Sequence, residues 1–308
     1  MPRVIVVGGA NVDIKGRASS DLIAHTSNPG EVTVTVGGVG RNIAENLARL
    51  DIETSLATFV GDDSNGRRIR ESCSAAGIGT AMVETGNQPT GVYLAVLDRN
   101  GEMTVAVNDM RAADLMTVDY LQGRSHRLAA AGMLVADCNL PADCLSWLCH
   151  FASEIRVPLL IEPISVPKAR KLLGFNRSPP VFAITPNLQQ LESLTAETNT
   201  MTAIVKLHRL GFANIVVHCG SDGAIVSDGV EPPRRVPALD VEDVADVTGA
   251  GDAAVAGLIC GLVSGHDLLA SARLGQASAA IKLRSRKSVA SGITRGSVFA
   301  LAGLAEDN

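Results

Sequence analysis

The sequence is poor in aromatic residues, contains no long hydrophobic run and has no excess of positive charge. One Trp, two Tyr and six Phe among 308 residues are too few for an aromatic platform that stacks nucleic-acid bases. The net charge of −5 excludes a strongly basic surface for duplex DNA or anionic lipid. The longest apolar run, residues 253–263, is shorter than the about 18 to 20 residues of a membrane-spanning helix. We therefore expect neither a nucleic-acid partner nor a membrane partner.

The six cysteines do not have the spacing of a metal site or a redox motif, because no C-x-x-C pair occurs. The chain enters an apolar segment at Val4 without the three-part pattern of a secretory signal. Both features indicate reduced thiols and a cytoplasmic protein. The pattern G-x-x-x-x-G-K-[ST] is also missing, which excludes a P-loop nucleotidase.

Hydrophobic residues make up 46% of the chain and charged residues 19%, which is enough apolar material for a full core. Short β-branched segments alternate with segments of helical periodicity, and this alternation predicts an α/β fold whose parallel sheet is covered on both faces. Strands are expected at residues 4–7, 55–60, 133–136, 158–161, 181–184, 215–218 and 224–226. Helices are expected at residues 42–50, 64–76, 141–155, 187–194 and 201–210, and over most of the chain after 249.

Two stretches depart from this alternation. Residues 31–36 alternate valine with polar side chains, and residues 91–97 and 102–107 flank an Asn-Gly pair, which is a strong hairpin signal. Strands with one polar face indicate a small antiparallel sheet that is solvated on one side. We expect one α/β domain over residues 1–308, with a lid formed by insertions at about 14–37 and 88–112. The alternative is that these strands extend the main sheet.

The sharpest local signal is the heptapeptide DVTGAGD at residues 246–252. A Gly-Ala-Gly turn at a helix start leaves backbone N–H groups free, and the helix dipole adds positive potential there. Such a nest suits a phosphoryl group that gains charge during transfer. Asp252, in the first helical turn, can accept the proton of an attacking hydroxyl.

Two other interpretations of this heptapeptide remain open. One is ordinary capping, because aspartate is favoured in a first helical turn. The other is a dinucleotide site, because Gly249, Gly251 and Ala254 match G-x-G-x-x-A. That fingerprint should follow a hydrophobic strand, whereas here an acidic stretch precedes it.

Two glycine-rich segments lie near the start of the chain. The segment GGVGRN at residues 37–42 can press its backbone against a ligand, and Asn42 can both donate to and accept from paired sugar hydroxyls. The segment GGANVD at residues 8–13 follows the first strand, at the edge where open α/β sheets bind ligands. Asp13 can take two vicinal hydroxyls there. The alternatives are a tight strand-to-helix turn and a solvated loop carboxylate.

Together, the pattern G-G-x-G-x-N-x-A at residues 37–44 and DVTGAGD resemble the two signatures of the PfkB carbohydrate kinase family, also called the ribokinase family. Asp13, the lid strands, Thr-Pro-Asn at 185–187 and Gly-Ser-Asp-Gly at 220–223 extend the resemblance over nearly the whole chain. Within the family, the chain is similar to the pseudouridine kinases, on the segments 8–16, 27–32, 37–50, 93–102 and 108–111.

The resemblance implies a ribokinase-like three-layer α/β/α body with a mainly parallel central sheet and a small β-strand lid. It also implies an ATP-dependent kinase that phosphorylates the 5′-hydroxyl of a nucleoside, pseudouridine above all. Its alternatives are a ribokinase, another nucleoside or sugar kinase of the family, and a catalytically weakened nucleoside-sensing homologue. A nicotinamide oxidoreductase has only the weak glycine match in its favour.

The resemblance also implies roles for individual residues. Asp252 is the base that takes the proton of the substrate hydroxyl, and the N–H groups of Gly249, Ala250 and Gly251 form an anion hole for the γ-phosphoryl group. The implied cofactors are ATP and Mg²⁺, with K⁺ where many members bind a potassium-like ion. The remaining positions are Asn11, Asp13, Gly38 and Asn42 for the substrate, Asn187, Gly220, Gly223 and Gln276 for ATP, and Asp246 and Thr248 for the monovalent cation.

One departure from the family concerns its N-x-x-E motif, whose Glu is tied to magnesium and phosphate through water. In this chain Gln190 occupies the Glu position, and an amide cannot supply the negative charge that attracts a hard dication. Glu162, at the end of an expected strand, is a candidate to compensate in the magnesium network, and the alternative is a plain strand-end carboxylate.

We also expect a homodimer formed through the lid. The lid has few strands for a free-standing sheet, and its exposed edges invite pairing with a second copy.

Overall fold

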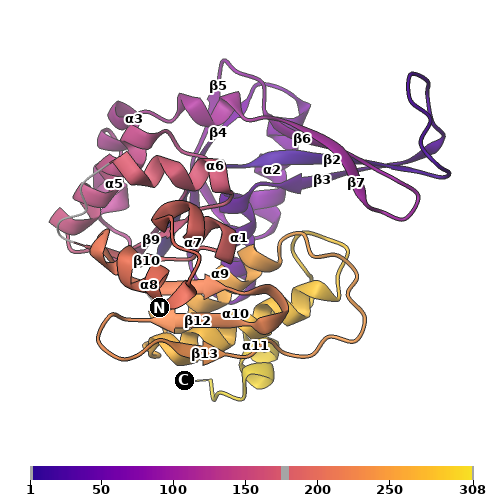
Figure 1. Ribbon diagram of the computed structural model, residues 1–308. Helices are drawn as coiled ribbons and strands as arrows, with labels where there is room; N and C mark the ends of the chain where they lie inside the picture. The colour runs from indigo at the N-terminus through magenta and orange to yellow at the C-terminus, as the bar shows by residue number, and fades with distance from the viewer. Residues whose placement is uncertain (1–2, 175–179, 307–308) are drawn as a thin grey trace.

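Figure 1 shows a computed structural model of the chain, which describes residues 3–174 and 180–306. Its centre is a sheet of nine strands among the described residues, in the order β13-β12-β11-β10-β9-β8-β1-β4-β5. Neighbours are parallel from β11 to β5, whereas β12 and β13 pair in antiparallel fashion. The strands are β1 (Val4–Val7), β4 (Thr54–Gly61), β5 (Gly79–Gly86), β8 (Met133–Asp137), β9 (Leu159–Glu162), β10 (Val181–Ile184), β11 (Phe212–His218), β12 (Ala224–Ser227) and β13 (Arg234–Val236).

Helices cover both faces of this sheet, so the body has the three expected layers (Figure 1). In β1, Val4 and Val6 belong to one buried cluster, with α1, α2, α9, α10 and α11, while Ile5 and Val7 belong to a second cluster on the opposite face. A strand buried on both faces is a continuous apolar run, which is why β1 consists of four β-branched residues. The helices on the first face are α1 (Val39–Arg49), α2 (Ser64–Ala75), α9 (Ala250–Val263), α10 (Leu268–Leu283) and α11 (Arg295–Ala302).

The second face carries the helices α3 to α8, of which α5 has 13 residues. None of the helices in the described part of the chain is long and apolar enough to cross a membrane. The remaining elements are α3 (Val118–Gln122), α4 (Ser125–Leu128), α5 (Ala142–Glu154), α6 (Val166–Ala169), α7 (Leu188–Thr195), α8 (Thr200–Arg209) and the 3₁₀ segments at Arg111–Leu115, Arg170–Gly174 and Gly220–Asp222.

A second, four-stranded sheet projects from the body, and we call it the lid (Figure 1). It consists of β2 (Asn11–Ala18), β3 (Gly30–Gly37), β6 (Gly91–Leu97) and β7 (Met103–Asp109), in the order β3-β2-β6-β7. These strands are therefore separate from the main sheet and do not extend it. Three strands, β2, β5 and β13, were not predicted from the sequence. In β2 and β5, glycine or charged residues interrupt the apolar residues, and β13 has only three residues.

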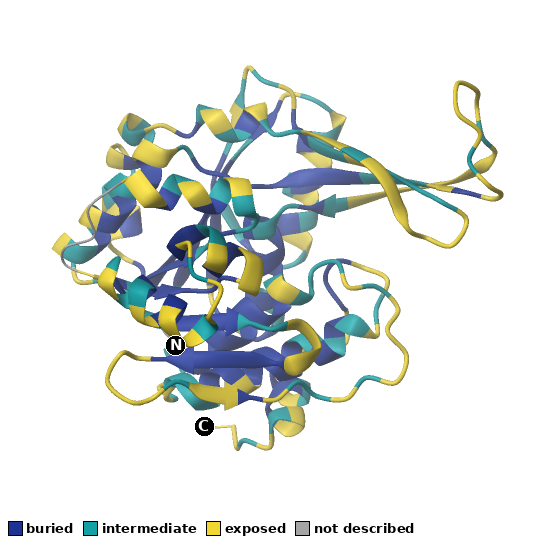
Figure 2. Ribbon diagram, viewed as in Figure 1, coloured by how far each residue is buried: buried dark blue, intermediate teal, exposed yellow. Residues whose placement is uncertain are grey.

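The two faces of the lid differ in polarity. The ladder pairs Ile14 with Val34 and Leu94, and Leu94 with Val107, so these side chains share one face. Several members of that face are exposed. The edge strands β3 and β7 are largely exposed, whereas β2 and β6 between them are mostly buried or intermediate (Figure 2). The opposite face carries Asp13 and Lys15 and is turned toward the body, where Lys15 contacts the motif before α9. The exposed apolar lid residues are Val32, Val34, Leu94, Met103, Val105 and Val107.

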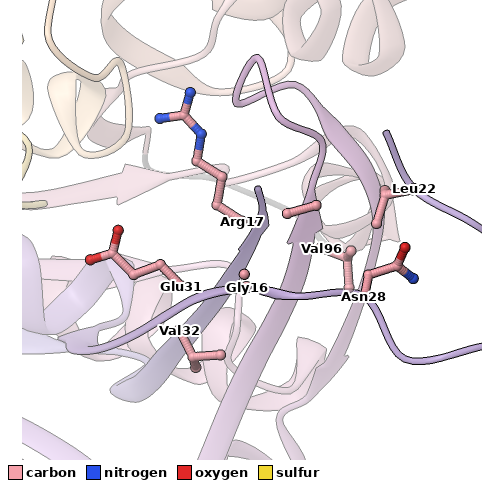
Figure 3. A pocket seen from close by; sticks show the side chains of 9 residues that line it. Gly16, Arg17, Leu22, Asn28, Glu31, Val32 and Val96 are labelled. Atoms are coloured by element: carbon pink, nitrogen blue, oxygen red, sulfur yellow. The ribbon is translucent and has the colours of Figure 1, made fainter. Parts of the chain in front are cut away.

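A cavity of about 260 Å³ lies at the outer part of the lid (Figure 3). Gly16 lies at its base, in register with Val32 on one side and Val96 on the other. Apart from Gly16 itself and its two chain neighbours, no heavy atom lies within 4 Å of the position that a Cβ of Gly16 would occupy. The missing side chain therefore leaves a hollow in the apolar face of the lid.

Candidate active site

The carboxyl ends of the parallel strands and the start of α9 meet at one edge of the main sheet. β8 ends at Asp137 and β9 ends at Glu162, and these two residues are direct partners in the ladder. Thr185 follows β10, and its hydroxyl donates to Glu162 Oε2 over 2.5 Å. Open α/β sheets bind ligands at this edge, as expected from the sequence.

Asp252 lies in the first turn of α9, where one hydrogen bond fixes its orientation. The Asn42 side-chain amide donates from Nδ2 to Asp252 Oδ2 over 2.8 Å. Burial raises the pKa of Asp252 to about 7, and the charges of Asp137 and Asp13 add to this effect. A carboxyl group with this pKa changes its ionisation near neutral pH, which suits a general base.

The N-terminus of α9 is open for an anion. No side chain caps it, and the helix begins after Gly249, which has a φ of 85°. The Ala250 N–H donates to the Val247 carbonyl over 3.2 Å. This N–H group therefore points into its own loop and not toward the anion hole to which it was predicted to contribute. Gly251 and Asp252 supply N–H groups in the first turn, which have no intrahelical acceptors. Together with the helix dipole, they favour negative charge at this point.

Replacing Gly249 with alanine should lower the free energy of unfolding by about 2 to 3 kcal/mol, because its φ is left-handed. An added Cβ would also lie 2.1 Å from the Ser288 carbonyl oxygen. Gly251 is the matched control: it has no positive φ, and a Cβ there meets nothing within 4 Å. Thermal unfolding of both variants measures the difference, and equal melting temperatures would contradict the requirement for glycine at 249.

Of the residues predicted to bind substrate, Asn42 contacts Asp252 directly and Asp13 acts on it through its charge. Asp13 lies on β2, and its Oδ1 accepts a hydrogen bond of 2.6 Å from Asn11 Nδ2. Gly38 has a φ of 98° and lies so close to Ala10 that a Cβ would be 2.6 Å from the Ala10 Cα. The backbone just before β2 and the loop before α1 are thus pressed together, and a side chain at Gly38 would separate them.

The amide of Asn42 is held from both sides. Arg41 Nη1 donates to Asn42 Oδ1 over 3.0 Å, while Asn42 Nδ2 donates to Asp252. Arg41 itself pairs with Glu45 inside α1. This chain of contacts positions Asn42 between the substrate loop and the carboxylate of Asp252.

Asp137 is a site residue that the sequence reasoning missed. It is fully buried, and its Oδ2 accepts the backbone N–H groups of Gly9 and Gly40, each over 2.8 Å. Its Oδ1 accepts the N–H of Asn139 over 2.9 Å. One carboxylate therefore ties together the two glycine-rich loops that carry Asp13 and Asn42. The sequence feature that could have identified Asp137 is its position as the acidic residue at the end of an otherwise apolar strand.

Close behind the open end of α9 lies a cavity of about 480 Å³. It brings together Gly220, Gly223 and Gln276, three of the four positions predicted for ATP, with Ala250 and Gly251. Gly223 has a φ of 86°, and a Cβ there would lie 2.1 Å from the Val236 carbonyl oxygen. The rest of the lining is mainly apolar and includes His218, Leu239, Val244, Val247 and Leu283, which the sequence reasoning did not single out.

Asn187 lies beside this cavity, paired through its backbone with His218. It is also the N-cap of α7, where Asn187 Oδ1 accepts the Gln190 N–H over 2.9 Å. In return, Gln190 Oε1 accepts the Asn187 N–H over 2.8 Å, which completes a capping box. The side chain of Gln190 therefore caps the N-terminus of α7, a role that glutamate can also perform.

Metal-binding groups are sparse at this edge. Among residues 3–174 and 180–306, no three His, Cys, Asp or Glu side chains gather as a metal-binding group. Burial raises the pKa of Glu162 to about 8, and the charges of Asp252 and Asp137 contribute. Magnesium commonly binds one or two protein carboxylates together with substrate phosphates and waters, and Glu162 fits that demand in its ionised form.

Comparisons with known proteins show which proteins this chain is similar to in sequence and in fold. The model of the pfkB family carbohydrate kinases matches residues 1–294. The pseudouridine kinase of Escherichia coli (strain K12) is 32% identical over 287 residues, which cover 91% of this chain and 90% of that protein. A carbohydrate kinase from Agrobacterium tumefaciens has a solved structure with a TM-score of 0.87 and 29% identity, covering 99% of this chain and 98% of that one. Arabidopsis thaliana ribokinase complexed with ribose and ATP has the same fold, with a TM-score of 0.83 at 23% identity and 99% of both chains covered.

Proposed function

The chain belongs to the pfkB family of carbohydrate kinases, and on that premise we propose that it transfers the γ-phosphoryl group of ATP to the 5′-hydroxyl of pseudouridine. Members of this family are phosphotransferases that act on hydroxyl groups, so the reaction class follows from membership. The observation that carries the proposal is Asp252, held by Asn42 beside the uncapped N-terminus of α9. The full-length similarity to a pseudouridine kinase supports the choice of nucleoside.

In the proposed reaction, the substrate's 5′-oxygen attacks the γ-phosphorus of ATP while its proton passes to the Asp252 carboxylate. The bond between the γ-phosphorus and the bridging oxygen breaks, and ADP leaves. The N–H groups of Gly251 and Asp252 stabilise the charge on the transferring group. Asp13 and Asn42 hold the ribose hydroxyls, and the nucleotide lies in the 480 Å³ cavity.

Magnesium bound to the triphosphate would neutralise part of its charge, and Glu162 and Asn187 are the side chains we propose for that network. Neither carries out a chemical step. Glu162 already accepts hydrogen bonds from Thr185 and from the Ile164 N–H, which fix the direction of its carboxyl group.

Changing Gln190 to glutamate should lower the magnesium concentration needed for half-maximal rate and leave nucleoside affinity unchanged. One carboxylate oxygen can keep the capping bond to Asn187, while the added charge attracts the dication. Gln189, an exposed neighbour, is the matched control for charge alone. The measurement is a magnesium titration of initial rate at fixed ATP for the wild type, Gln190→Glu and Gln189→Glu. Superimposable curves would mean that position 190 does not limit metal use.

The nucleoside preference is testable in a single assay. Release of ADP is measured with pseudouridine, uridine, ribose and fructose at matched concentrations, and pseudouridine should give the highest kcat/KM. A preference for ribose or fructose would make the chain a sugar kinase, the choice favoured by its likeness to the Agrobacterium tumefaciens carbohydrate kinase. Tight nucleoside binding without turnover would identify a sensing protein, although Asp252 and its open helix end argue against this.

The protein is further proposed to be a homodimer joined through the lids and to work in the cytoplasm. The outer part of the apolar face of the lid is uncovered, and the hollow at Gly16 can accept an apolar side chain from a second lid. Buried thiols at Cys73, Cys138, Cys144 and Cys260 suit a reducing compartment.

Light scattering should give twice the chain mass of 32.0 kDa for the wild type. Val105→Glu, on the apolar lid face, should give the mass of a single chain, because a charge would have to be buried in the interface. Val230→Glu is the control, since Val230 is 86% exposed and lies outside the lid. A wild-type mass of 32.0 kDa would exclude the dimer, and a dimeric Val105→Glu protein would place the interface elsewhere.

A further inference from the structure

A buried lysine lies directly beneath the motif that leads into α9. Lys282, in the last turn of α10, has an exposed fraction of 0%. Its Nζ donates to the Asp246 carbonyl oxygen over 2.6 Å and to the Ser285 carbonyl oxygen over 3.0 Å. A fully buried ammonium group with two backbone carbonyl partners is uncommon, because lysine is almost never completely removed from water unless it is paired.

The same segment is where the family resemblance places a monovalent cation, with Asp246 and the Thr248 carbonyl as ligands. The residues present do not fit that expectation. The Asp246 carbonyl already accepts from Lys282, and Asp246 Oδ2 lies 3.4 Å from the ammonium group of Lys15 on the lid. Two fixed positive charges thus approach Asp246 from α10 and from β2, and a third cation would be repelled by both.

We propose that Lys282 is a built-in replacement for the monovalent cation, a positioning residue that makes phosphoryl transfer by this chain independent of K⁺. An ammonium group and K⁺ carry the same charge and are similar in size, and both bind backbone carbonyl oxygens. Because Lys282 is part of the chain, its positive charge is present at every ionic composition. A bound ion would be present only in proportion to its concentration.

The physical effect of Lys282 is to hold the loop that forms the open helix end. The loop is attached to the end of α10 and to the segment after it: Ala245 N–H donates to the carbonyl of Leu283, the last residue of α10, over 2.8 Å, and Gly249 packs against the Ser288 carbonyl. Without the ammonium group, the carbonyls of Asp246 and Ser285 would lose a shared donor beside this contact. The loop would then shift, and with it the N–H groups of α9 that face the phosphoryl group.

A plainer interpretation is that Lys282 only neutralises the C-terminus of α10, as lysines in a last helical turn commonly do. That role requires contact with the carbonyls of its own helix. The shorter of the two contacts of Lys282 instead joins α10 to Asp246, which is distant in sequence. The two interpretations differ in what they predict for potassium.

The first experiment uses the wild-type protein and does not depend on any variant folding. Initial rates are measured in K⁺, Na⁺ and tetramethylammonium chloride at equal ionic strength, which keeps charge screening constant, and should agree within about twofold. The melting temperature of the protein alone should also be the same in the three salts. Activation by K⁺ of more than about fivefold over tetramethylammonium, at constant screening, would overturn the proposal.

The second experiment removes the ammonium group. Lys282→Ala should lose about 10- to 100-fold in kcat in tetramethylammonium, because the phosphoryl site is displaced. K⁺ or NH₄⁺ should restore part of the rate and raise the melting temperature of this variant. Lys282→Met fills the space without charge and should not respond to either ion. Lys287→Ala, at an exposed lysine nearby, is the control and should behave as wild type.

Only the rate measurements depend on the proposed kinase reaction. A loss in Lys282→Ala that is equal in K⁺ and tetramethylammonium, with no effect of K⁺ on its melting temperature, would overturn it. The melting experiments need no substrate, so their outcome is independent of whether pseudouridine is the preferred nucleoside.

Discussion

Replacing Asp252 with asparagine should lower kcat by about 10²- to 10⁴-fold, the range expected for loss of a general base. Asparagine keeps an oxygen that can accept from Asn42, so the contact that joins α1 to α9 is preserved. Nucleoside affinity should therefore stay close to that of the wild type, because Asp13 and Asn42 are unchanged. Turnover is measured by ADP release and affinity by calorimetry. A variant that keeps more than about a third of wild-type turnover would show that Asp252 is not the base.

The pH dependence of the wild type supplies an independent check. The pKa of Asp252 is about 7, and only the ionised carboxylate can take a proton. Below that pH, kcat/KM should fall about tenfold per unit, and above it the rate should level off. This pH dependence reflects the pKa of Asp252 in the enzyme without substrate, because kcat/KM depends on the ionisation of the free enzyme.

The raised pKa also predicts a gain in stability for Asp252→Asn. The folded state holds a proton on Asp252 up to about pH 7, whereas the unfolded chain releases it near the ordinary aspartate pKa of 3.8. The contribution of Asp252 to stability is therefore present at acid pH and is lost as pH rises between those values. At pH 8 the variant should melt at or above the temperature of the wild type, which separates loss of catalysis from loss of folding.

Replacing Asp137 with alanine should lower the free energy of unfolding by about 3 to 9 kcal/mol, because it leaves three buried N–H groups without acceptors at about 1 to 3 kcal/mol each. The three donors are the backbone N–H groups of Gly9, Gly40 and Asn139. Because these groups fix the loops that carry Asp13 and Asn42, the KM for the nucleoside should rise as well. Chemical denaturation and substrate titration measure the two effects.

Two further variants serve as controls for the effect of Asp137→Ala. Asp137→Asn keeps one oxygen acceptor and should fall between the wild type and Asp137→Ala in stability. Asp119→Ala removes an exposed aspartate and should change little. If Asp137→Ala melts like Asp119→Ala, the carboxylate does not hold the two loops.

Much of the fold could be predicted from local patterns. The four apolar residues of β1, the valine alternation of β3 and the Asn-Gly pair between β6 and β7 each reflect interactions within a few residues, which a sequence displays directly. β2 was missed because its pattern of Val12, Ile14, Gly16 and Ala18 contains little apolar volume, and its strand character depends on pairing with β3 and β6.

The candidate site was only partly predictable. Asp252 and the glycines before it stand in one heptapeptide, and the structure places them at a helix start as expected. Asp137 and Lys282 were not found, because their partners lie far away in sequence: Gly9 and Gly40 for Asp137, and Asp246 for Lys282. Gln190 was found as a departure from the family, but its capping bond to Asn187 became visible only with the backbone of α7 in place.

The sequence by itself determined the alternation of strands and helices, the glycines with left-handed φ and the carboxylate at the start of α9, because these depend on backbone preferences and on neighbours within a turn. The tertiary structure alone decided which charges face one another. Folding removed Asp137 and Lys282 from water and gave each of them distant backbone partners. It also brought Asp13 and Asp137 near Asp252, which raises the pKa of the proposed base. Desolvation and the summed field of distant charges arise only when the chain is packed, so no local pattern encodes them.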